Sequence, residues 1–156
     1  MKVWILLCAL LFPALLHAEE QTLAPWTLLD QHDRPYTLAD DLQVLLVARD
    51  MAGAKLVEAA LARKPEGYLE QRHAVFLADI SRMPSLIAKM FAVPAMRDYP
   101  YRVILDREAR IVPRYDVPAE AVLWLQLDGR RVIERQSFTD AAQLGAALQR
   151  LQRLQP

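Results

Sequence analysis

The sequence is very poor in cysteine, and this shortage limits its chemistry. Its 156 residues contain a single cysteine, Cys8, in an apolar stretch close to the N-terminus. If that stretch is removed on export, the mature chain forms no disulfide, offers no thiolate nucleophile and builds no thiolate metal site. Thiol redox chemistry is therefore excluded for the mature chain.

Glycine, histidine and serine are also scarce. The four glycines are isolated, so no Gly-x-Gly-x-x-Gly loop is present to cradle the phosphates of a dinucleotide. Beyond the N-terminal stretch, His32 and His73 are the only histidines, and the sequence places no carboxylates beside both, so no metal site is predicted. The serines, Ser81, Ser85 and Ser137, lie outside any Gly-x-Ser-x-Gly elbow, which argues against a serine hydrolase.

Methionine is the remaining soft ligand. Met83, Met90 and Met96 surround one predicted helix, and Met51 lies at the start of another. Thioether sulfur binds soft metals, but methionine on an amphipathic helix is more often a filler of apolar cores. No metal cofactor is predicted from these residues.

No charge of either sign dominates the chain. Nineteen Lys and Arg balance nineteen Asp and Glu, and the two signs are interspersed without a basic stripe. A nucleic-acid partner is therefore not expected. With 54% hydrophobic and 24% charged residues, the composition is that of an ordinary globular domain with one core.

The N-terminus has the pattern of a secretory signal. Lys2 supplies a positive start, residues 3–16 form an apolar segment, and Ala18 is a small residue just before the expected cleavage site. We interpret residues 1–18 as a signal peptide that is cleaved on export. We therefore expect a periplasmic protein.

The alternative to a cleaved signal is an uncleaved membrane anchor. The apolar segment is about fourteen residues long and is interrupted by Pro13, whereas a spanning helix needs roughly 20 residues. We therefore expect residues 19–156 to form one domain without membrane contact after cleavage.

The rest of the chain is organised around a strand that leads into a helix. The apolar run Val44–Val47 is followed by a polar pair and then by residues with helical spacing, which predicts a buried strand and a helix over residues 52–63. Asp50 stands where an N-cap is needed, because its carboxylate accepts from the free N–H groups of the first turn.

Other local patterns predict the remaining elements. An N-terminal hairpin is expected around a turn that contains Asp33, and Asp128-Gly129 is the strongest hairpin signal of the chain. A helix is expected over residues 85–91, ending before Pro94, and a last helix after Thr139 or Asp140. The further strands are predicted over residues 74–78, 102–106, 110–115, 122–127 and 131–138.

This order of elements resembles the thioredoxin-like superfamily over nearly the whole mature chain. Residues 25–42 are similar to the opening hairpin of its peroxiredoxin and thiol-disulfide reductase branch. Residues 44–61 are similar to its strand, active-site turn and first helix, and residues 123–151 to its closing hairpin and C-terminal helix. The resemblance implies an α/β fold with a central mixed β-sheet flanked by helices and an N-terminal β-hairpin.

Within that superfamily, the chain resembles the YtfJ-type periplasmic proteins. The residues that carry this likeness are, in chain order, Ala52-Gly53, Tyr99-Pro100-Tyr101, Leu105-Asp106 and Leu127-Asp128-Gly129-Arg130-Arg131-Val132. The likeness supports the architecture and the periplasmic compartment rather than an activity.

The chain departs from the superfamily at the position of its chemistry. Met51-Ala52-Gly53-Ala54, followed by Lys55, stands where thiol oxidoreductases have Cys-x-x-Cys followed by Lys. The nucleophilic cysteine of peroxiredoxins and the threonine three residues before it are absent as well. Ala121 stands where a cis-proline usually precedes the penultimate strand. The resemblance therefore implies a member that lacks the catalytic cysteines.

The start of the first helix is one candidate binding site. A helix N-terminus favours anions, and small side chains would leave its donors accessible. A small anionic ligand or a partner's carboxylate would dock there; the alternative is that Asp50 already satisfies these donors. The candidate residues are Arg49, Asp50, Met51, Ala52, Gly53, Ala54 and Lys55.

The connection over residues 92–102 is a second candidate. It combines two prolines, two tyrosines and two arginines, and Tyr and Arg are frequent at interaction hot spots. In the resembled fold such a connection can approach the first helix's N-terminus; the alternative is a stiff loop whose tyrosines cover the sheet edge. The candidate residues are Tyr99, Pro100, Tyr101 and Arg102.

Together these observations predict a non-catalytic periplasmic module that binds an unidentified periplasmic protein or a small anionic ligand. No cofactor is predicted. The alternative is an oxidoreductase that takes its redox centre from a redox partner or from a bound cofactor such as a flavin, stacked on Trp26, Trp124 or the tyrosines.

Overall fold

The structure is a computed structural model that describes residues 21–153, so the interpreted signal peptide lies outside the described residues. In the described part the strands are β1 (Thr27–Asp30), β2 (Pro35–Thr37), β3 (Val44–Ala48), β4 (Ala74–Asp79), β5 (Val103–Asp106), β6 (Val122–Asp128) and β7 (Arg131–Phe138). The helical elements are α1 (Met51–Leu61), η1 (Glu70–Arg72), α2 (Ser85–Ile87), η2 (Ala88–Ala92), α3 (Val93–Met96), η3 (Val112–Tyr115) and α4 (Ala141–Arg153). No helix among residues 21–153 is long and apolar enough to cross a membrane.

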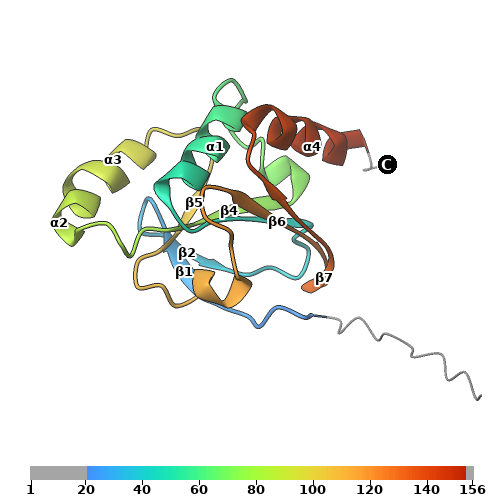
Figure 1. Cartoon of the computed structure of the whole chain (residues 1–156), viewed down its shortest axis with the longest axis horizontal. Helices are drawn as coiled ribbons and strands as arrows, with labels where there is room; N and C mark the ends of the chain where they lie inside the picture. The colour runs from blue at the N-terminus through green and yellow to red at the C-terminus, as the bar shows by residue number, and fades with distance from the viewer. Residues whose placement is uncertain (1–20, 154–156) are drawn as a thin grey trace, which may run out of the picture.

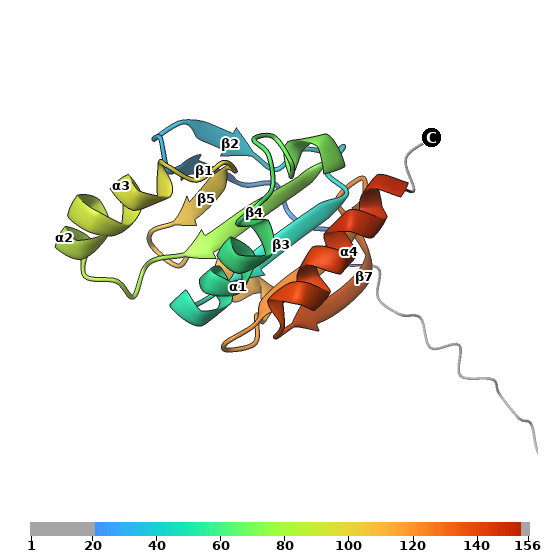
Figure 2. The same ribbon diagram turned by 90° about the horizontal axis from the view of Figure 1, so that it is seen from above.

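The strands form one mixed sheet in the order β2-β1-β5-β4-β3-β6-β7. β3, β4 and β5 run parallel to one another, and the other neighbours pair antiparallel, including the hairpin of β1 with β2. Helices α1 and α4 contact each other and lie on one face of the sheet, while α2 and α3 stand out at one side (Figures 1 and 2). The predicted central mixed sheet flanked by helices is confirmed.

The apolar core has two layers because β3 is buried on both faces. Along this strand Val44, Leu46 and Ala48 belong to the layer beneath α1 and α4, and Leu45 and Val47 belong to the layer on the other face. Alternate residues of a strand point to opposite faces, so a continuous apolar run is what a central strand requires. The carboxyl end of β3, where α1 begins, therefore lies between the neighbouring strands β4 and β6.

The strand predicted over residues 110–115 is wrong, because this segment folds into the short helix η3. The carboxylate of Asp106 accepts hydrogen bonds from the backbone N–H groups of Arg110 (2.9 Å), Ile111 (2.8 Å) and Val112 (2.9 Å). These three bonds wind the chain into a turn directly after β5. Ile111 and Val112 then enter the second core layer, so their apolar character reflects burial rather than sheet pairing.

The helix predicted to end before Pro94 in fact continues through that proline to Met96. Between α2 and α3 the chain makes a π turn, in which the N–H of Val93 bonds to the carbonyl of Ala88. Proline has no N–H and ordinarily breaks a helix, but a wider π turn just before it accommodates the ring. Residues 85–96 therefore form one continuous helical segment.

The first described residues pair with the β6–β7 hairpin. The N–H of Leu23 donates to the carbonyl of Arg130 at 2.8 Å, and the N–H of Val132 donates to the carbonyl of Gln21 at 2.8 Å. Thr22 thereby forms an antiparallel bridge with Arg131 at the start of β7.

Candidate functional site

The N-terminus of α1 lies at the carboxyl end of β3 and is capped by Asp50. One carboxylate oxygen of Asp50 accepts from the N–H of Gly53 at 2.8 Å, and the other accepts from the N–H of Glu120 at 2.8 Å. The predicted N-cap is confirmed. The same side chain also ties the loop before β6 to the start of α1.

The surroundings of Asp50 keep its carboxylate charged. Burial alone would raise its pKa, but hydrogen bonds from the N–H groups of Glu120 and Gly53, together with the charges of Arg49 and Arg82, outweigh that effect and lower it. The helix N-terminus therefore already carries one negative charge. This favours the interpretation in which Asp50 satisfies the first-turn donors over one in which a free anion does so.

Gly53 lies where a second stretch of backbone passes close to α1. A Cβ at this position would collide with the carbonyl oxygen of Ala121 and would also crowd the Cβ of Ala48 at 3.2 Å. Glycine is required here by packing, not only by access to the helix donors. Ala121, at the position matched to the superfamily's cis-proline, thus forms a wall beside the start of α1.

A groove of about 250 Å³ opens beside the start of α1. Met51, Met83 and Met96 supply much of its lining, and Arg49 and Arg82 place cationic side chains along it. Methionine side chains adapt to the shapes of different apolar groups, which suits them to binding surfaces. Met51 is far from Met83 and Met96 in the sequence, so only the folded chain shows that they share one groove.

Arg49 brings an unused donor to this groove. Its Nε is buried and finds no hydrogen-bond partner among the described residues. The same residue lines an adjoining cavity of about 200 Å³ that Arg82 and Asp79 also line. Buried donors in proteins are nearly always paired, so Arg49 has not completed its hydrogen bonds among the described residues.

The structure sorts the candidate residues at the start of α1 into three groups. Arg49, Asp50, Met51 and Ala54 line the groove. Gly53 is buried against the loop before β6. Ala52 and Lys55 are exposed and lie outside the groove lining.

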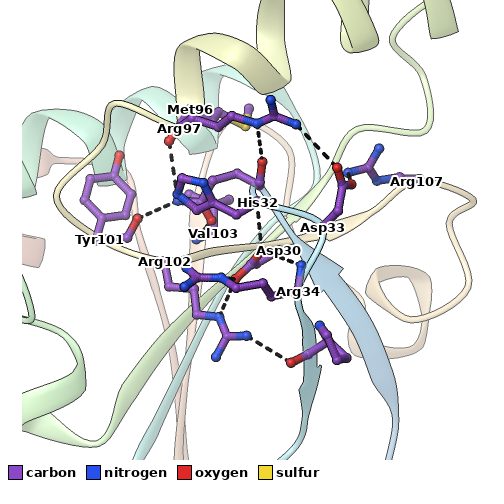
Figure 3. Close-up of polar contacts among 12 residues, drawn as sticks. Asp30, His32, Asp33, Arg34, Met96, Arg97, Tyr101, Arg102, Val103 and Arg107 are labelled. Carbon is purple, nitrogen blue, oxygen red and sulfur yellow. Dashed lines mark hydrogen bonds and ion pairs between the residues drawn. The ribbon is translucent and has the colours of Figure 1, made fainter.

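The second candidate segment lies at the opposite end of the parallel strands, before β5 begins. The ring of Tyr99 stacks on Tyr101 with 5.1 Å between centroids. The carbonyl of Tyr101 accepts from Nε2 of Gln31 at 2.8 Å, and Nε of Arg102 donates to Asp30 at 2.8 Å (Figure 3). Within the connection over residues 92–102, Met96 lies at the groove beside the N-terminus of α1. Tyr99–Arg102 lie further along, where the chain enters β5 at its amino end.

The segment before β5 instead closes a polar cluster around the buried Asp30 and Gln31. We call this cluster the hairpin clamp: Asp30, Gln31, Arg97 and Arg102. Burial would raise the pKa of Asp30, but the N–H groups of Arg34 and His32 and the side chain of Arg102 hold it below its usual range. The carbonyl of Gln31 accepts from Nε of Arg97 at 2.9 Å (Figure 3). The clamp fastens the β1–β2 hairpin to the rest of the sheet.

A cavity of about 600 Å³ lies beside the clamp. Its lining mixes the acids Glu66 and Glu70 with the cations Arg34 and Arg102, so it favours ligands of neither charge.

Across residues 21–153, no three His, Cys, Asp or Glu side chains gather in a way that could hold a metal ion.

The strand β3, the helix α1 at its carboxyl end and the closing β6–β7 hairpin with α4 define a thioredoxin-like fold. The peroxidoxin BcpB from Mycobacterium tuberculosis superposes with a TM-score of 0.58 at 19% identity, over 88% of this chain and 97% of that one. The thioredoxin domain of a thiol-disulfide oxidoreductase from Bacteroides vulgatus gives 0.56 at 13% identity, over 84% and 95%. The mitochondrial 2-Cys peroxiredoxin from Plasmodium falciparum gives 0.51 at 9% identity, over 86% and 92%.

These likenesses show a shared fold and no more. No family model matches the chain, and no curated protein matches it in sequence. Residues 21–153 contain no cysteine, whereas the solved structures above are described as peroxiredoxins or a thiol-disulfide oxidoreductase. What the groove binds must therefore be argued from its own residues.

Proposed function

We propose that this domain is a non-catalytic periplasmic module that binds a partner polypeptide in the groove beside the N-terminus of α1. The observation that carries the proposal is the unpaired, buried Nε of Arg49 at the edge of a methionine-lined groove. An apolar side chain of the partner fits against Met51, Met83 and Met96. A carboxylate or carbonyl oxygen of the same partner accepts from Arg49.

The absence of a thiol supports a binding role over thiol catalysis. In thiol oxidoreductases a helix N-terminus lowers the pKa of a cysteine and so generates the attacking thiolate. Here the described residues contain no cysteine, and the same helix end stabilises the carboxylate of Asp50 instead. The described chain thus has the helix N-terminus that would lower the pKa of a thiol, but no thiol at that position.

A polypeptide fits the groove better than a small anion or a flavin does. A small anion would meet the negative charge of Asp50 at the helix end. The groove volume of about 250 Å³ is below the roughly 300–1,000 Å³ typical of pockets that enclose small molecules or cofactors. A side chain that projects from a partner needs less room, and the rest of its backbone can lie on the surface.

Export is supported by the signal pattern of residues 1–18 and by the likeness to YtfJ-type periplasmic proteins. The partner is then a protein of the same compartment. Cleavage can be tested directly, because the exported protein should begin close to Glu19 when its N-terminus is determined by mass spectrometry.

Site-specific photo-crosslinking in cells tests the binding site. We expect a benzoylphenylalanine at Met51, which is 50% exposed in the groove, to capture a discrete partner. The matched control is the same probe at Ile133, which is 53% exposed on β7. The substitutions Arg49→Gln and Arg82→Gln should reduce capture at Met51. Equal capture at both probe positions, or capture insensitive to both substitutions, would overturn the proposal.

Two assays on the purified protein address catalysis. We expect no thiol-disulfide reductase activity and no visible absorbance, including after incubation with flavin mononucleotide or flavin adenine dinucleotide. A bound chromophore or electron transfer would instead establish the alternative, an oxidoreductase with a borrowed redox centre.

A further inference from the structure

The helical segment 85–96 exposes an unusual concentration of large apolar side chains. Four of the large hydrophobic residues exposed in the described chain lie on it, and we call them the apolar ridge: Leu86, Ile87, Met90 and Phe91. Their exposed fractions are 65%, 46%, 58% and 63%. Exposed apolar side chains gathered on one element mark an interaction surface.

The ridge is one face of the segment, and the other face packs on the body. Its members are spaced i, i+1, i+4 and i+5, which places them together on a helix. Val93 and Met96 on the other side are buried in the core beneath the sheet-covering helices. Figures 1 and 2 show α2 and α3 projecting at the side of the molecule. The ridge therefore projects with this segment, and none of its four side chains lines the cavity beside it.

The segment also carries a local positive charge. Between Asp79 and Asp98 the sequence contains Arg82, Lys89 and Arg97 and no acidic residue, although the whole chain has no net charge. Lys89 is exposed and lines a cavity of about 740 Å³ between the segment and the body. Arg97 is paired with Asp33 across this cavity, so the remaining cations of the segment are Arg82 and Lys89. An apolar ridge beside these cations is complementary to a surface that is apolar inside and anionic outside.

We propose that the apolar ridge docks the domain on the surface of an anionic phospholipid bilayer. The ridge enters the boundary between headgroups and acyl chains, and Lys89 of the same segment lies at the level of the headgroup phosphates. Fluid lipid accepts a projection of mixed Leu, Ile, Met and Phe without a complementary shape, whereas a protein partner must supply a groove. This proposal differs from the expectation, drawn from the sequence, of no membrane contact after cleavage.

Vesicle co-sedimentation of the purified exported protein tests the proposal. We expect binding to vesicles of equal parts phosphatidylglycerol and phosphatidylcholine, and weaker binding to phosphatidylcholine alone. Leu86→Gln combined with Phe91→Gln should lower the partition coefficient at least tenfold. Lys89→Gln should lower the partition coefficient about fivefold, which corresponds to the contribution of one cation near a charged membrane surface. Rising salt should weaken binding because it screens that charge.

Matched variants elsewhere on the surface serve as controls. Ile133→Gln removes an apolar side chain with 53% exposure from β7, and Arg150→Gln removes an exposed cation from α4. Neither should change vesicle binding, and circular dichroism should show that every variant is folded. The proposal is overturned if the unaltered protein does not sediment with the anionic vesicles, or if the control variants lose binding as strongly as the ridge variants.

The outcome for the ridge is separable from that for the groove. One outcome is that the ridge variants keep their binding to vesicles and yet lose the capture of a protein at Met51. In that case the ridge belongs to a protein interface and the lipid proposal fails. Loss of vesicle binding with normal capture at Met51 supports the lipid proposal and leaves the proposed function intact.

Discussion

The hairpin clamp and the groove at the start of α1 differ in how completely their side chains are paired. At the amino end of β5, the hairpin clamp buries Asp30 and Gln31, which are 0% and 1% exposed, and supplies each with hydrogen-bond partners. At the carboxyl ends of β3 and β4, Nε of Arg49 is buried without a partner and the apolar ridge is exposed. The clamp region has completed its contacts within the chain, whereas the groove and ridge have not.

This contrast separates residues that hold the fold from residues that are free to bind. A fully satisfied buried network specifies one arrangement, and removing any member leaves an unpaired group. Side chains left exposed or unpaired in the groove and on the ridge contribute little to folding and are available to a partner. We therefore expect stability to depend on the clamp and binding to depend on the groove and the ridge.

The largest expected effect is the loss of the central carboxylate of the clamp. Asp30→Ala should lower the free energy of unfolding by about 3 kcal/mol, because it leaves the partly buried Arg102 and the backbone N–H groups of His32 and Arg34 without their acceptor. Asp33→Asn is the control, since Asp33 pairs with Arg97 and Arg107 but is 57% exposed, and surface pairs contribute about 1 kcal/mol or less. Asparagine is chosen because Asp33 has a left-handed backbone, with φ of 58°, which asparagine tolerates. Urea unfolding measures both, and equal losses for the two variants would contradict the contrast.

The same carboxylate should make stability depend on acid pH. Its pKa in the folded protein is lower than the value of about 3.9 for an unfolded aspartate. The stabilisation is therefore fully present above about pH 4 and is lost as pH falls through the folded pKa. Unfolding of the protein and of Asp30→Asn between neutral pH and pH 2 should show a difference that narrows on acidification, and a constant difference would argue against this linkage.

The substitution Gly53→Ala should destabilise the protein by about 1–3 kcal/mol, the usual cost of forcing a methyl group into packed surroundings. Helix propensity alone predicts the opposite sign, since alanine stabilises a helix by about 1 kcal/mol relative to glycine. Gly145→Ala is the control, because a Cβ there meets Ala60 at an ordinary 3.8 Å. Thermal unfolding should therefore give opposite shifts for the two variants, and shifts of the same sign would refute the close approach of Ala121.

A smaller difference is expected between the two aspartate caps. Asp140 accepts from the N–H of Gln143 at the start of α4, whereas Asp50 caps α1 and also holds Glu120. Asp140→Ala should lower the free energy of unfolding by about 1 kcal/mol, a typical loss for an N-cap. Asp50→Ala should lower it by about 1 kcal/mol more, because it also removes the hydrogen bond to Glu120. Chemical unfolding compares the two, and a smaller loss at Asp50 would show that the second contact adds nothing.

The smallest effect on stability is expected at the apolar ridge. Leu86→Gln and Phe91→Gln should each change the free energy of unfolding by less than about 0.5 kcal/mol, as is usual for exposed positions. A loss above about 2 kcal/mol, the range of buried apolar side chains, would show that the ridge belongs to the core of the isolated chain. That result would remove the distinction between the clamp and the ridge.

The local features of the fold could be predicted from the sequence because each depends on neighbouring residues. The run Val44–Val47 indicates a buried strand, and Asp50 before a helical pattern indicates a cap; both agree with the structure. The predicted strand over residues 110–115 fails because its helical turn is imposed by Asp106, which lies outside the pattern. The early stop at Pro94 fails because the preceding π turn leaves no signature in the residue types.

The candidate site could be predicted only in part, because its parts are far apart in the chain. The sequence identified the α1 end through Asp50 and Met51, but Met83 and Met96 reach the groove only through the sheet order. The clamp was missed for the same reason, since Asp30 and Arg102 are 72 positions apart. The position of Tyr99–Arg102 could have been inferred, because a loop entering a parallel strand lies at its amino end.

The bridge between Thr22 and Arg131 protects part of the outer strand β7 from pairing with other copies of the protein. An outer strand with free N–H and C=O groups is a template on which a second molecule can add its own strand and start aggregation. At the beginning of β7 the backbone of residues 21–23 already uses the groups of Arg130 and Val132. Residues 21–23 therefore cover part of the edge of the sheet. A change that detaches them should first lower the solubility of the protein at high concentration.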